Sequence, residues 1–367
     1  MQEPAPEKHE GGDVREATMA SANQLGRLFD LVGRAVKWPG FGCGLSEAEY
    51  DEFDATVVRA YHRNGWFTEE QVRHALRALS SMLSEEELRS WCDRHPLPRD
   101  ARPGSRIGLI TAGNVPLVGF HDLLAVLLSG HQAHVKVSGQ DAGLLQAVTT
   151  IWGCYYQDLR DRVVFREQEL GTVDAVIATG STNTARYFEH YFGHLPRIIR
   201  RNRVSVAVLD GTESEAELIA LGEDVFRYYG LGCRNVAQLY LPTTMDTDRL
   251  FRAFYDHRHV VEHNKYANNY DYHRALWLLE GIPFLDNGFV LLKEDRSLNS
   301  PTGTLFICRY DDPVEVEREL AAHEDRIQCV VGHGWIPFGR SQYPTVQDHA
   351  DGVDTLGFLM GLYSTNS

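Results

Sequence analysis

From residue 106 onward, short apolar runs alternate with longer helix-like segments, and this alternation constrains the fold more than any other feature of the chain. Buried strands are expected at residues 106–111, 133–137, 162–165, 174–178 and 204–209. Helices are expected between them at residues 119–128, 142–156 and 182–192. Strands that alternate with helices are joined by crossover connections, which favour a parallel sheet covered by helices. We therefore predict an α/β fold.

The alternation resumes near Cys233, so a second α/β region is expected to follow the first. Its strands are predicted at residues 236–241, 289–292 and 304–309, and a helix at residues 246–257. A chain of 367 residues is long enough for two or three domains of ordinary size. The pattern thus indicates two α/β domains in tandem.

The first hundred residues do not show this alternation of strands and helices. Their sequence contains three predicted helix starts instead. Ser46, Thr68 and Ser84 are each followed three residues later by Glu or Gln, which is the capping-box pattern. Residues 1–18 are rich in Glu, Pro and Gly and lack an apolar core. We expect these 18 residues to form a disordered tail and residues 19–102 to be mainly helical.

The charge of the chain argues against general binding of nucleic acid. Its formal net charge is −15, whereas a nucleic-acid-binding surface needs positive groups to neutralise phosphates. An anionic ligand would need a local positive patch, and residues 197–203 hold four arginines in seven residues. These arginines could meet the phosphates of a nucleotide or of coenzyme A. A solvated strand edge or a network of ion pairs explains them equally well.

Cysteine spacing and hydropathy bear on the compartment of the protein. The six cysteines form no Cys-x-x-Cys pair and no grouping with histidine at zinc-like spacing, so neither a disulfide framework nor a metal site is favoured. The longest apolar run, residues 123–128, is too short to span a bilayer. We expect a cytoplasmic protein with no export signal and no membrane span.

Cys233 is the first candidate for chemistry, because it follows Gly230 and Gly232 between a helix-like and a strand-like segment. Glycines allow unusual backbone angles and close approach to a ligand, so a thiol at such a turn can be presented as a nucleophile. Cysteine is also among the most buried residue types. Taken by itself, Cys233 is better explained as a thiol of the core than as a catalyst.

Three other loops that follow predicted strands carry suggestive residues. Asn114 could donate its amide to an oxyanion, Lys136 ends an apolar strand, and residues 180–182 (Gly180, Ser181 and Thr182) open a helix whose N–H groups suit a phosphate. Each has an ordinary structural explanation as a turn cap, a surface lysine or a helix cap. The Gly-x-Gly-x-x-Gly dinucleotide fingerprint is absent.

The order and spacing of these four elements resemble those of the aldehyde dehydrogenase superfamily. The resemblance covers about residues 103–340: Asn114-Val115-Pro116, then Lys136, then Thr179-Gly180-Ser181-Thr182, then Gly230-Leu231-Gly232-Cys233. Within that superfamily, four segments look like the acyl-CoA reductases related to LuxC, namely residues 229–236, 263–272, 284–289 and 350–355. The stretch 263–272 could line a substrate entrance or form a loop that packs two domains together, and we assign it no catalytic role.

The resemblance implies an aldehyde-dehydrogenase-like α/β fold with two Rossmann-type domains and a helical N-terminal region. A cofactor-binding domain would span residues 103–228, a catalytic domain residues 229–340, and a C-terminal segment residues 341–367. Cys233 would be the nucleophile, and the amide of Asn114 with the Cys233 backbone N–H would form the oxyanion hole. Lys136 would meet the adenosine ribose or its phosphate, and Gly180, Ser181 and Thr182 would contact the rest of the cofactor. A homo-oligomer is expected by the same analogy.

Three departures from the superfamily pattern refine the expected function. Ile199 stands where hydrolytic members carry a water-activating glutamate, and Asn299 where a glutamate holds the nicotinamide ribose. Gly139 replaces an acidic residue that would repel a 2′-phosphate, which favours NADP(H). We expect NADPH-dependent reduction of an acyl-CoA, or of an acyl-carrier thioester, to the aldehyde. The alternatives are a hydrolytic aldehyde dehydrogenase with another base, and a non-catalytic partner of an acyl-transferring protein.

Overall fold

The computed structural model describes residues 11–97, 104–141, 143–180 and 182–365, and these residues form two compact units. The first unit contains the chain up to Arg201 together with residues 345–367, and the second contains residues 202–344. Within the described residues, no helix has both the length and the apolar character needed to cross a membrane. The predicted α/β fold is confirmed in both units.

Four helices form the N-terminal part of the first unit: α1 (Gly11–Gly33), α2 (Glu47–Arg63), α3 (Glu69–Met82) and α4 (Glu85–Arg94). A short 3-10 turn, η1 (Phe41–Cys43), lies between the first two. Ser46 makes both hydrogen bonds of the capping box, and Ser84 accepts the Glu87 N–H. Thr68 precedes α3 as predicted but makes no side-chain capping bond. The three helix starts are therefore confirmed, two of them with their capping contacts.

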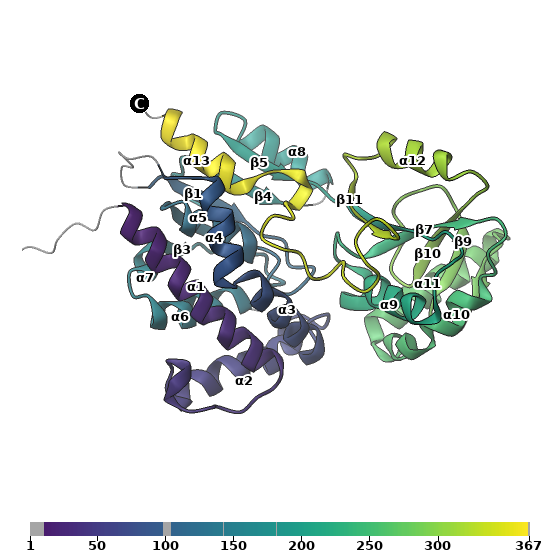
Figure 1. Cartoon of the computed structure of the whole chain (residues 1–367), viewed down its shortest axis with the longest axis horizontal. Helices are drawn as coiled ribbons and strands as arrows, with labels where there is room; N and C mark the ends of the chain where they lie inside the picture. The colour runs from purple at the N-terminus through teal and green to yellow at the C-terminus, as the bar shows by residue number, and fades with distance from the viewer. Residues whose placement is uncertain (1–10, 98–103, 142, 181, 366–367) are drawn as a thin grey trace, which may run out of the picture. The chain divides into compact units, whose positions relative to one another are not determined.

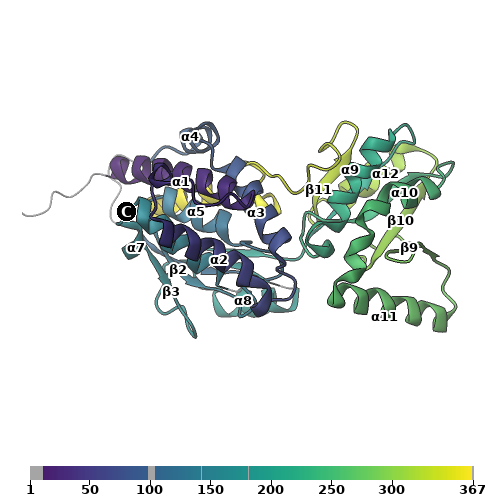
Figure 2. The same cartoon turned by 90° about the horizontal axis from the view of Figure 1, so that it is seen from below.

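Helix α1 corrects the expected tail, because residues 11–18 belong to a helix; residues 1–10 lie outside the described residues. The buried Arg15 guanidinium donates to the carbonyl oxygens of Leu128 at 2.8 Å and His95 at 2.7 Å. These bonds hold the first turns of α1 against distant parts of the unit, and Leu25 and Phe29 are fully buried further along it. Helix α1 packs against α3 and α4 and against two helices of the sheet region (Figure 2). Tertiary contacts thus impose helix on a locally unfavourable sequence.

The first sheet has five parallel strands in the order β3-β2-β1-β4-β5 (Figure 1). Their bounds are β1 (Arg106–Ile110), β2 (Gln132–Lys136), β3 (Val163–Phe165), β4 (Ala175–Thr179) and β5 (Arg197–Arg200). The connecting helices are α5 (Phe120–Leu128), α6 (Leu144–Tyr155), α7 (Leu159–Arg162) and α8 (Thr182–Tyr191). Every residue of α5 except His121 is buried, which explains why its sequence is almost entirely apolar.

The second sheet has six strands in the order β11-β6-β7-β10-β9-β8, all parallel except the edge strand β8. Their bounds are β6 (Val204–Val208), β7 (Val236–Pro242), β8 (Leu285–Asp286), β9 (Leu291–Glu294), β10 (Thr304–Tyr310) and β11 (Ile327–Gly332). The helical elements are α9 (Glu215–Phe226), η2 (Arg227–Gly230), α10 (Asp248–Ala253), η3 (Phe254–Glu262), α11 (Asn264–Glu280) and α12 (Pro313–Ala322).

Three expectations are corrected in the second unit. The strand predicted at residues 204–209 is β6, which pairs with β7 and β11, so residues 202–228 belong to the second unit rather than to the first. The helix predicted at residues 246–257 is α10 followed by the 3-10 helix η3. The segment 263–272 is the cap and first part of α11, not a loop (Figure 2).

The C-terminal segment folds back onto the first unit. It contains η4 (Ala350–Gly352) and α13 (Thr355–Thr365), and α13 packs against α5. Arg200 links this segment to the sheet, because its guanidinium bonds Asp122 and Thr355, each at 2.7 Å. Burial by itself would raise the pKa of Asp122, but the charge of Arg200 lowers it. Removing one partner of a buried ion pair strongly destabilises a protein, because the other charge is left buried without compensation. The pair therefore helps to hold the C-terminal segment against the sheet.

Candidate active site

The turn that carries Cys233 lies between η2 and β7 in the second unit. Cys233 is exposed, and like the other five cysteines it forms no disulfide. Shortly before it, at the end of η2, Tyr228, Tyr229 and Gly230 have φ values of 52°, 58° and 75°. The left-handed region costs a residue other than glycine about 1–3 kcal/mol, and such strain concentrates at functional sites. The unusual backbone predicted for the glycines is thus found at Gly230 and at two tyrosines, but not at Gly232.

Asn235, which sequence reasoning did not single out, holds this turn. It is buried, and its amide oxygen accepts the Gly232 N–H at 2.8 Å. Its amide nitrogen donates to the last carbonyl oxygens of α9 and the following residue: Asp224 at 3.1 Å, Val225 at 3.4 Å and Arg227 at 2.7 Å. One side chain therefore ties the C-terminal end of α9 to the residue before Cys233. The only signal in the sequence is an asparagine two residues after the cysteine, which is typical of turns.

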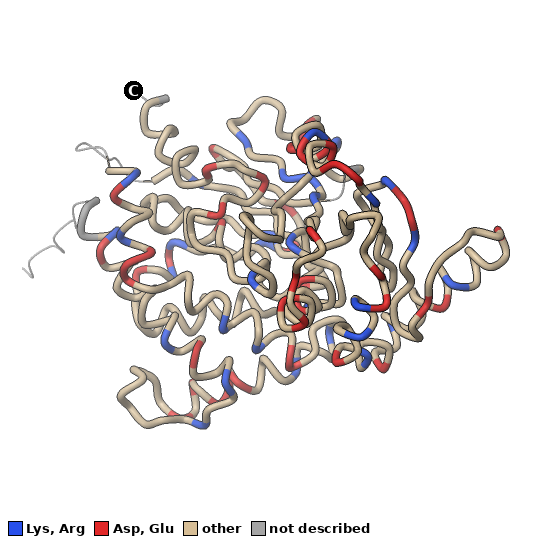
Figure 3. The backbone as a smooth tube through the Cα atoms, turned by 45° about the vertical axis from the view of Figure 1, so that its right-hand side comes forward, with Lys and Arg blue, Asp and Glu red and all other residues tan. Residues whose placement is uncertain are grey.

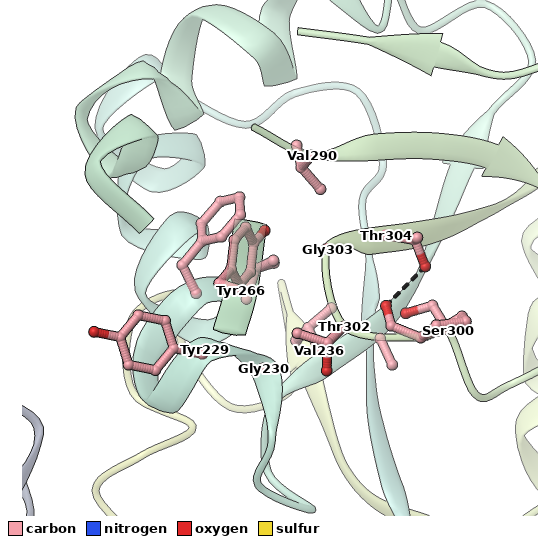
Figure 4. A pocket seen from close by; sticks show the side chains of 13 residues that line it. Tyr229, Gly230, Val236, Tyr266, Val290, Ser300, Thr302, Gly303 and Thr304 are labelled. Carbon is pink, nitrogen blue, oxygen red and sulfur yellow. Dashed lines mark hydrogen bonds between the residues drawn. The ribbon is translucent and has the colours of Figure 1, made fainter. Parts of the chain in front are cut away.

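Aromatic side chains surround the strained turn. Tyr229 stacks on His263, with ring centroids 4.3 Å apart, and lies 6.2 Å from the ring of Tyr266 (Figure 4). His263 also caps α11 by accepting the Tyr266 N–H at 3.4 Å. The hydroxyl of Tyr266 donates to the Phe289 carbonyl oxygen at 3.0 Å. Buried aromatic contacts of this type stabilise Tyr229 in its unfavourable backbone angles.

A pocket opens beside this turn within the second unit (Figure 4). Its lining comes from α9 and η2, from the starts of β7 and β10, and from Tyr266 of α11: Val225, Phe226, Tyr229, Gly230, Val236, Ala237, Tyr266, Val290, Ser300, Pro301, Thr302, Gly303 and Thr304. Thr304 donates its hydroxyl to the Pro301 carbonyl oxygen at 2.8 Å, which orders the loop at one side of the pocket. This loop directly follows Asn299, where the sequence departs from the superfamily pattern.

The other predicted site residues lie at one edge of the first sheet. Asn114 follows β1 and is exposed, Lys136 is the last residue of β2, and Gly180 follows β4. The three strands are neighbours and parallel, so their carboxyl ends meet at this edge. After β1 the chain adds β2 and β3 on one side of β1, and it then returns to add β4 and β5 on the other side. The boundary between β1 and β4 is therefore the topological switch point, where ligands bind in such sheets. Ser181 lies outside the described residues, and Thr182 begins α8.

Asn64 links the two loops at this edge and was also missed by sequence reasoning. It is buried, and its amide nitrogen donates to the carbonyl oxygens of Gly113 at 3.1 Å and Gln140 at 2.9 Å. A side chain at position 113 would come within 2.9 Å of the Gln140 Cβ, so Gly113 allows the loops to pack closely. Asn64 thereby positions the residue before Asn114 relative to the loop after Lys136.

The edge has features that would suit a dinucleotide. Lys136 supplies a positive charge, and its amine donates to the Gln168 carbonyl oxygen at 2.6 Å. Gly180 stands before α8, a ten-residue helix, and leaves little room for a side chain because an added Cβ would be 3.0 Å from Thr184. Gly139 is exposed with open space around an added Cβ. The residues therefore fit a phosphate-bearing cofactor at a helix N-terminus.

The four arginines of residues 197–203 engage protein groups. Arg200 is buried in the ion pair with Asp122, and Arg201 pairs with Glu189 at 2.6 Å. Arg197 and Arg203 donate to backbone carbonyl oxygens. Figure 3 shows positive and negative residues interspersed along the chain of each unit. The structure supports the ion-pair interpretation of this segment rather than a phosphate-binding patch.

A second polar cluster lies at the carboxyl ends of β6 and β11. Among the residues that the structure describes, Asp210, Glu213 and His333 place potential metal-ligand atoms within 4.8 Å of one another. The carboxylates of Asp210 and Glu217 bond the two ring nitrogens and raise the pKa of His333 to about 9. A protonated ring donates at both nitrogens and cannot ligate a metal. We therefore interpret the cluster as a group of ion pairs.

Asp141, beside the Lys136 loop, allows a prediction about pH. It is buried, accepts the Leu145 N–H at 3.3 Å, and its burial raises its pKa to about 6. The folded state therefore binds more protons than the unfolded state between about pH 4 and 6, so stability falls as pH rises through that window. We expect Asp141→Asn to increase the free energy of unfolding of the first unit by about 1–3 kcal/mol at pH 8.

Urea unfolding at pH 4 and pH 8 measures this effect, and the gain should be much smaller at pH 4. The matched control is Asp174→Asn, because hydrogen bonds from Arg106 outweigh the burial of Asp174 and lower its pKa. That substitution should give no gain at pH 8. Equal effects of Asp141→Asn at both pH values would contradict the prediction.

Comparisons with known proteins agree with this description. The family model of acyl-CoA reductase (LuxC) matches residues 46–249, which is more than half of the chain. A search among functionally curated proteins found no significant match. The matched range contains Asn114, Lys136, Gly180 and Cys233.

Solved structures share the fold at low sequence identity. An oxidoreductase from Marinobacter aquaeolei has a TM-score of 0.61 at 13% identity, covering 89% of this chain and 74% of that chain. An NAD-dependent aldehyde dehydrogenase from Sinorhizobium meliloti has a TM-score of 0.59 at 12% identity, covering 91% and 77%. An NAD-dependent benzaldehyde dehydrogenase from Corynebacterium glutamicum has a TM-score of 0.56 at 11% identity, covering 89% and 82%. The resemblance inferred from the sequence is confirmed: the chain has the aldehyde dehydrogenase fold and belongs to the LuxC family of acyl-CoA reductases.

Proposed function

We propose that the protein reduces a fatty acyl-CoA thioester to the aldehyde through an acyl-enzyme on Cys233, with NADPH as the reductant. The observation that carries the proposal is the exposed thiol on a strained and well-anchored turn, within the region that matches the LuxC family. A nucleophile needs both access and a fixed position. Asn235 supplies the position, because it ties the turn to α9.

The first half of the reaction is acyl transfer. The thiolate of Cys233 attacks the thioester carbonyl carbon, and the carbon–sulfur bond to coenzyme A breaks, so that coenzyme A leaves as a thiolate and Cys233 carries the acyl group. The amide of Asn114 and the Cys233 backbone N–H are assigned to the oxyanion formed in between. Exchange of one thioester for another is nearly isoenergetic, so this step depends on positioning more than on acid catalysis.

The second half releases the aldehyde. Bound NADPH supplies a hydride for the carbonyl carbon of the acyl group. The same oxyanion donors serve again, and Cys233 leaves as a thiolate when the aldehyde forms. Lys136 is assigned to the adenosine ribose or its phosphate, and Gly180, Ser181 and Thr182 to the remaining contacts with the cofactor.

Ile199 supports reduction over hydrolysis. It lies on β5 and packs, half-buried, against an apolar cluster that includes Val176 and Phe192. A side chain in that setting cannot activate water, and a base at this position would divert the acyl-enzyme to the free acid. The runner-up function, a hydrolytic aldehyde dehydrogenase, needs a base elsewhere.

Gly139 supports NADPH as the cofactor. It is exposed, and no atom lies within 4 Å of an added Cβ, so the position offers room and no negative charge near Lys136. A 2′-phosphate is accommodated where the usual acidic residue is missing. We further propose a cytoplasmic homo-oligomer that accepts acyl groups from coenzyme A, from an acyl carrier or from an acyl-transferring partner protein.

The test combines trapping with product analysis. Protein incubated with an acyl-CoA and no reductant should yield a tryptic peptide acylated on Cys233, and addition of NADPH should release the aldehyde. Comparison of kcat/KM for NADPH and NADH with acyl-CoAs of graded length then measures cofactor and chain preference. Free acid as the main product would favour the hydrolytic function, and no acylation at all would favour a non-catalytic partner subunit.

A further inference from the structure

A second cysteine lies next to the turn that carries Cys233. The hydroxyl of Ser205, on β6, donates to the Cys233 carbonyl oxygen at 2.9 Å and is 3.0 Å from the Cys329 sulfur. Ser205 is fully buried, Cys329 is half-buried on β11, and Cys233 is exposed. The two cysteines, 96 residues apart in the sequence, thus contact one and the same side chain.

An irregularity of the sheet places Cys329 there. Ile327 pairs with Val204 and Val330 pairs with Val206, so that two residues of β11 stand opposite the single residue Ser205. Such a bulge redirects a side chain, and bulges are common beside functional sites. Cys329 is one of the two residues that stand opposite Ser205.

We propose that Cys329 is the resolving thiol of Cys233: a hydroperoxide oxidises Cys233, and Cys329 then closes a reversible disulfide with it. The proposal deepens the proposed function, because the thiol that is protected is the assigned nucleophile. The disulfide itself is detected by peptide mapping, which requires no assay of activity.

The chemistry balances in two steps. The thiolate of Cys233 attacks a hydroperoxide oxygen and the oxygen–oxygen bond breaks, which gives a sulfenic acid on Cys233 and a hydroxide or alkoxide that takes a proton from solvent to become water or alcohol. The thiol of Cys329 then attacks that sulfur, its proton leaves with the hydroxyl group as water, and the disulfide forms. Two electrons pass from the two sulfurs to the peroxide. A dithiol reductant returns both thiols.

The position of Cys233 in a turn favours closure. A disulfide requires Cα atoms about 4.4–6.8 Å apart, so the residues must approach closely. Cys233 precedes β7 and lies outside its ladder, so a shift of its turn toward β11 breaks no strand pairing, although it must strain the hydrogen bonds with Asn235 and Ser205 that hold the turn in the reduced protein. Without a partner thiol, a sulfenic acid proceeds to the irreversible sulfinic acid.

The remaining cysteine of the second unit provides a matched control. Cys308 lies on β10 in register with Tyr240, which in turn is in register with Val208 of β6. Side chains alternate between the two faces of a strand, so Cys308 lies on the face opposite to Ser205. It packs in a separate apolar cluster, and its burial raises its pKa.

The experiment treats the full chain with an excess of hydrogen peroxide, because formation of a sulfinic acid consumes two peroxide molecules per thiol, then alkylates the remaining thiols and maps the peptides by mass spectrometry. We expect a peptide pair joined through Cys233 and Cys329 in wild type and in Cys308→Ala. In Cys329→Ser and Cys329→Ala, the linked pair should vanish and sulfinic acid on Cys233 should increase several-fold.

Once the protein is shown to reduce acyl-CoA, the recovery of that activity after oxidation is a second test. Dithiothreitol should restore most of the activity of the oxidised wild type and several-fold less of the activity of the oxidised Cys329 variants. Sulfinic acid on Cys233 of the wild type with Cys329 still open to alkylation would overturn the proposal, as would a link from Cys233 to Cys308 or to a second chain. If the disulfide forms in a protein that does not reduce acyl-CoA, the proposed function fails and this inference stands.

Discussion

Replacing Cys233 by serine is expected to lower the rate of acyl-CoA reduction by roughly 10⁴–10⁶-fold, as loss of a covalent nucleophile does in other enzymes. A serine hydroxyl is not ionised near neutral pH unless a base activates it, whereas a cysteine is partly thiolate and intrinsically more nucleophilic. The exposed position of Cys233 means that the exchange of sulfur for oxygen leaves the packing of the second unit intact. Oxidation of NADPH in the presence of an acyl-CoA measures the effect.

The control is Cys308→Ser, a cysteine of the same unit that lies in an apolar cluster and has no assigned role in the reaction. Its activity should stay within a few-fold of wild type, apart from any loss of stability. Mass spectrometry without reductant should show an acyl adduct on wild type and on Cys308→Ser, and none on Cys233→Ser. An adduct at another residue of Cys233→Ser, with turnover retained, would show that the nucleophile is elsewhere.

Replacing Asn114 by alanine is expected to lower kcat by about 10²–10³-fold, which is the usual cost of one oxyanion-hole donor. Asn114 is exposed at the carboxyl edge of the first sheet, and the preceding carbonyl is held by Asn64, so truncation at Cβ should not disturb the loop. The affinity for NADPH should change little, because the cofactor contacts are assigned to Lys136 and the α8 turn.

Steady-state kinetics with an acyl-CoA, together with NADPH binding followed by fluorescence, separates these two effects. Asn268→Ala, at an exposed asparagine on α11 in the second unit, is the matched control and should retain wild-type kcat. Near-native turnover of Asn114→Ala would remove this residue from the oxyanion hole. A large loss of NADPH affinity would instead assign it to the cofactor site.

The strands of the first sheet show how far local pattern carries a prediction. The strands β1, β2, β3 and β4 were expected within one or two residues of their bounds, because each is a short run rich in apolar residues and flanked by turn signals. Strand β5 was expected only as one alternative, a solvated strand edge, because the arginines at both of its ends also suggested a positive patch. Its identity as a strand depends on pairing with β4, and Arg200 depends on Asp122, which is 78 residues earlier in the chain.

Helix α11 illustrates a second kind of failure. Its first residues, from Asn264 to Tyr272, are polar and aromatic and form no apolar stripe. Neither hydrophobic periodicity nor a capping box therefore predicted a helix here. The structure shows His263 as its cap and Tyr266 and Tyr270 as its buried anchors. These tyrosines bond the Phe289 carbonyl oxygen and the Asp286 carboxylate, contacts that exist only after β8 and β9 have formed.

Some features of the candidate site were likewise predictable from the sequence, and others were not. Residue order along the chain determined the α/β class, the resemblance to the acyl-CoA reductases and the choice of Cys233, Asn114 and Lys136, because apolar periodicity and loop motifs are properties of neighbouring residues. The tertiary structure decided that Tyr228 and Tyr229 take the strained backbone, that Asn64 and Asn235 hold the two loops, and that Cys329 lies beside Ser205. These features arise from hydrogen bonds and strand pairing between residues far apart in the chain, and no local pattern encodes such contacts.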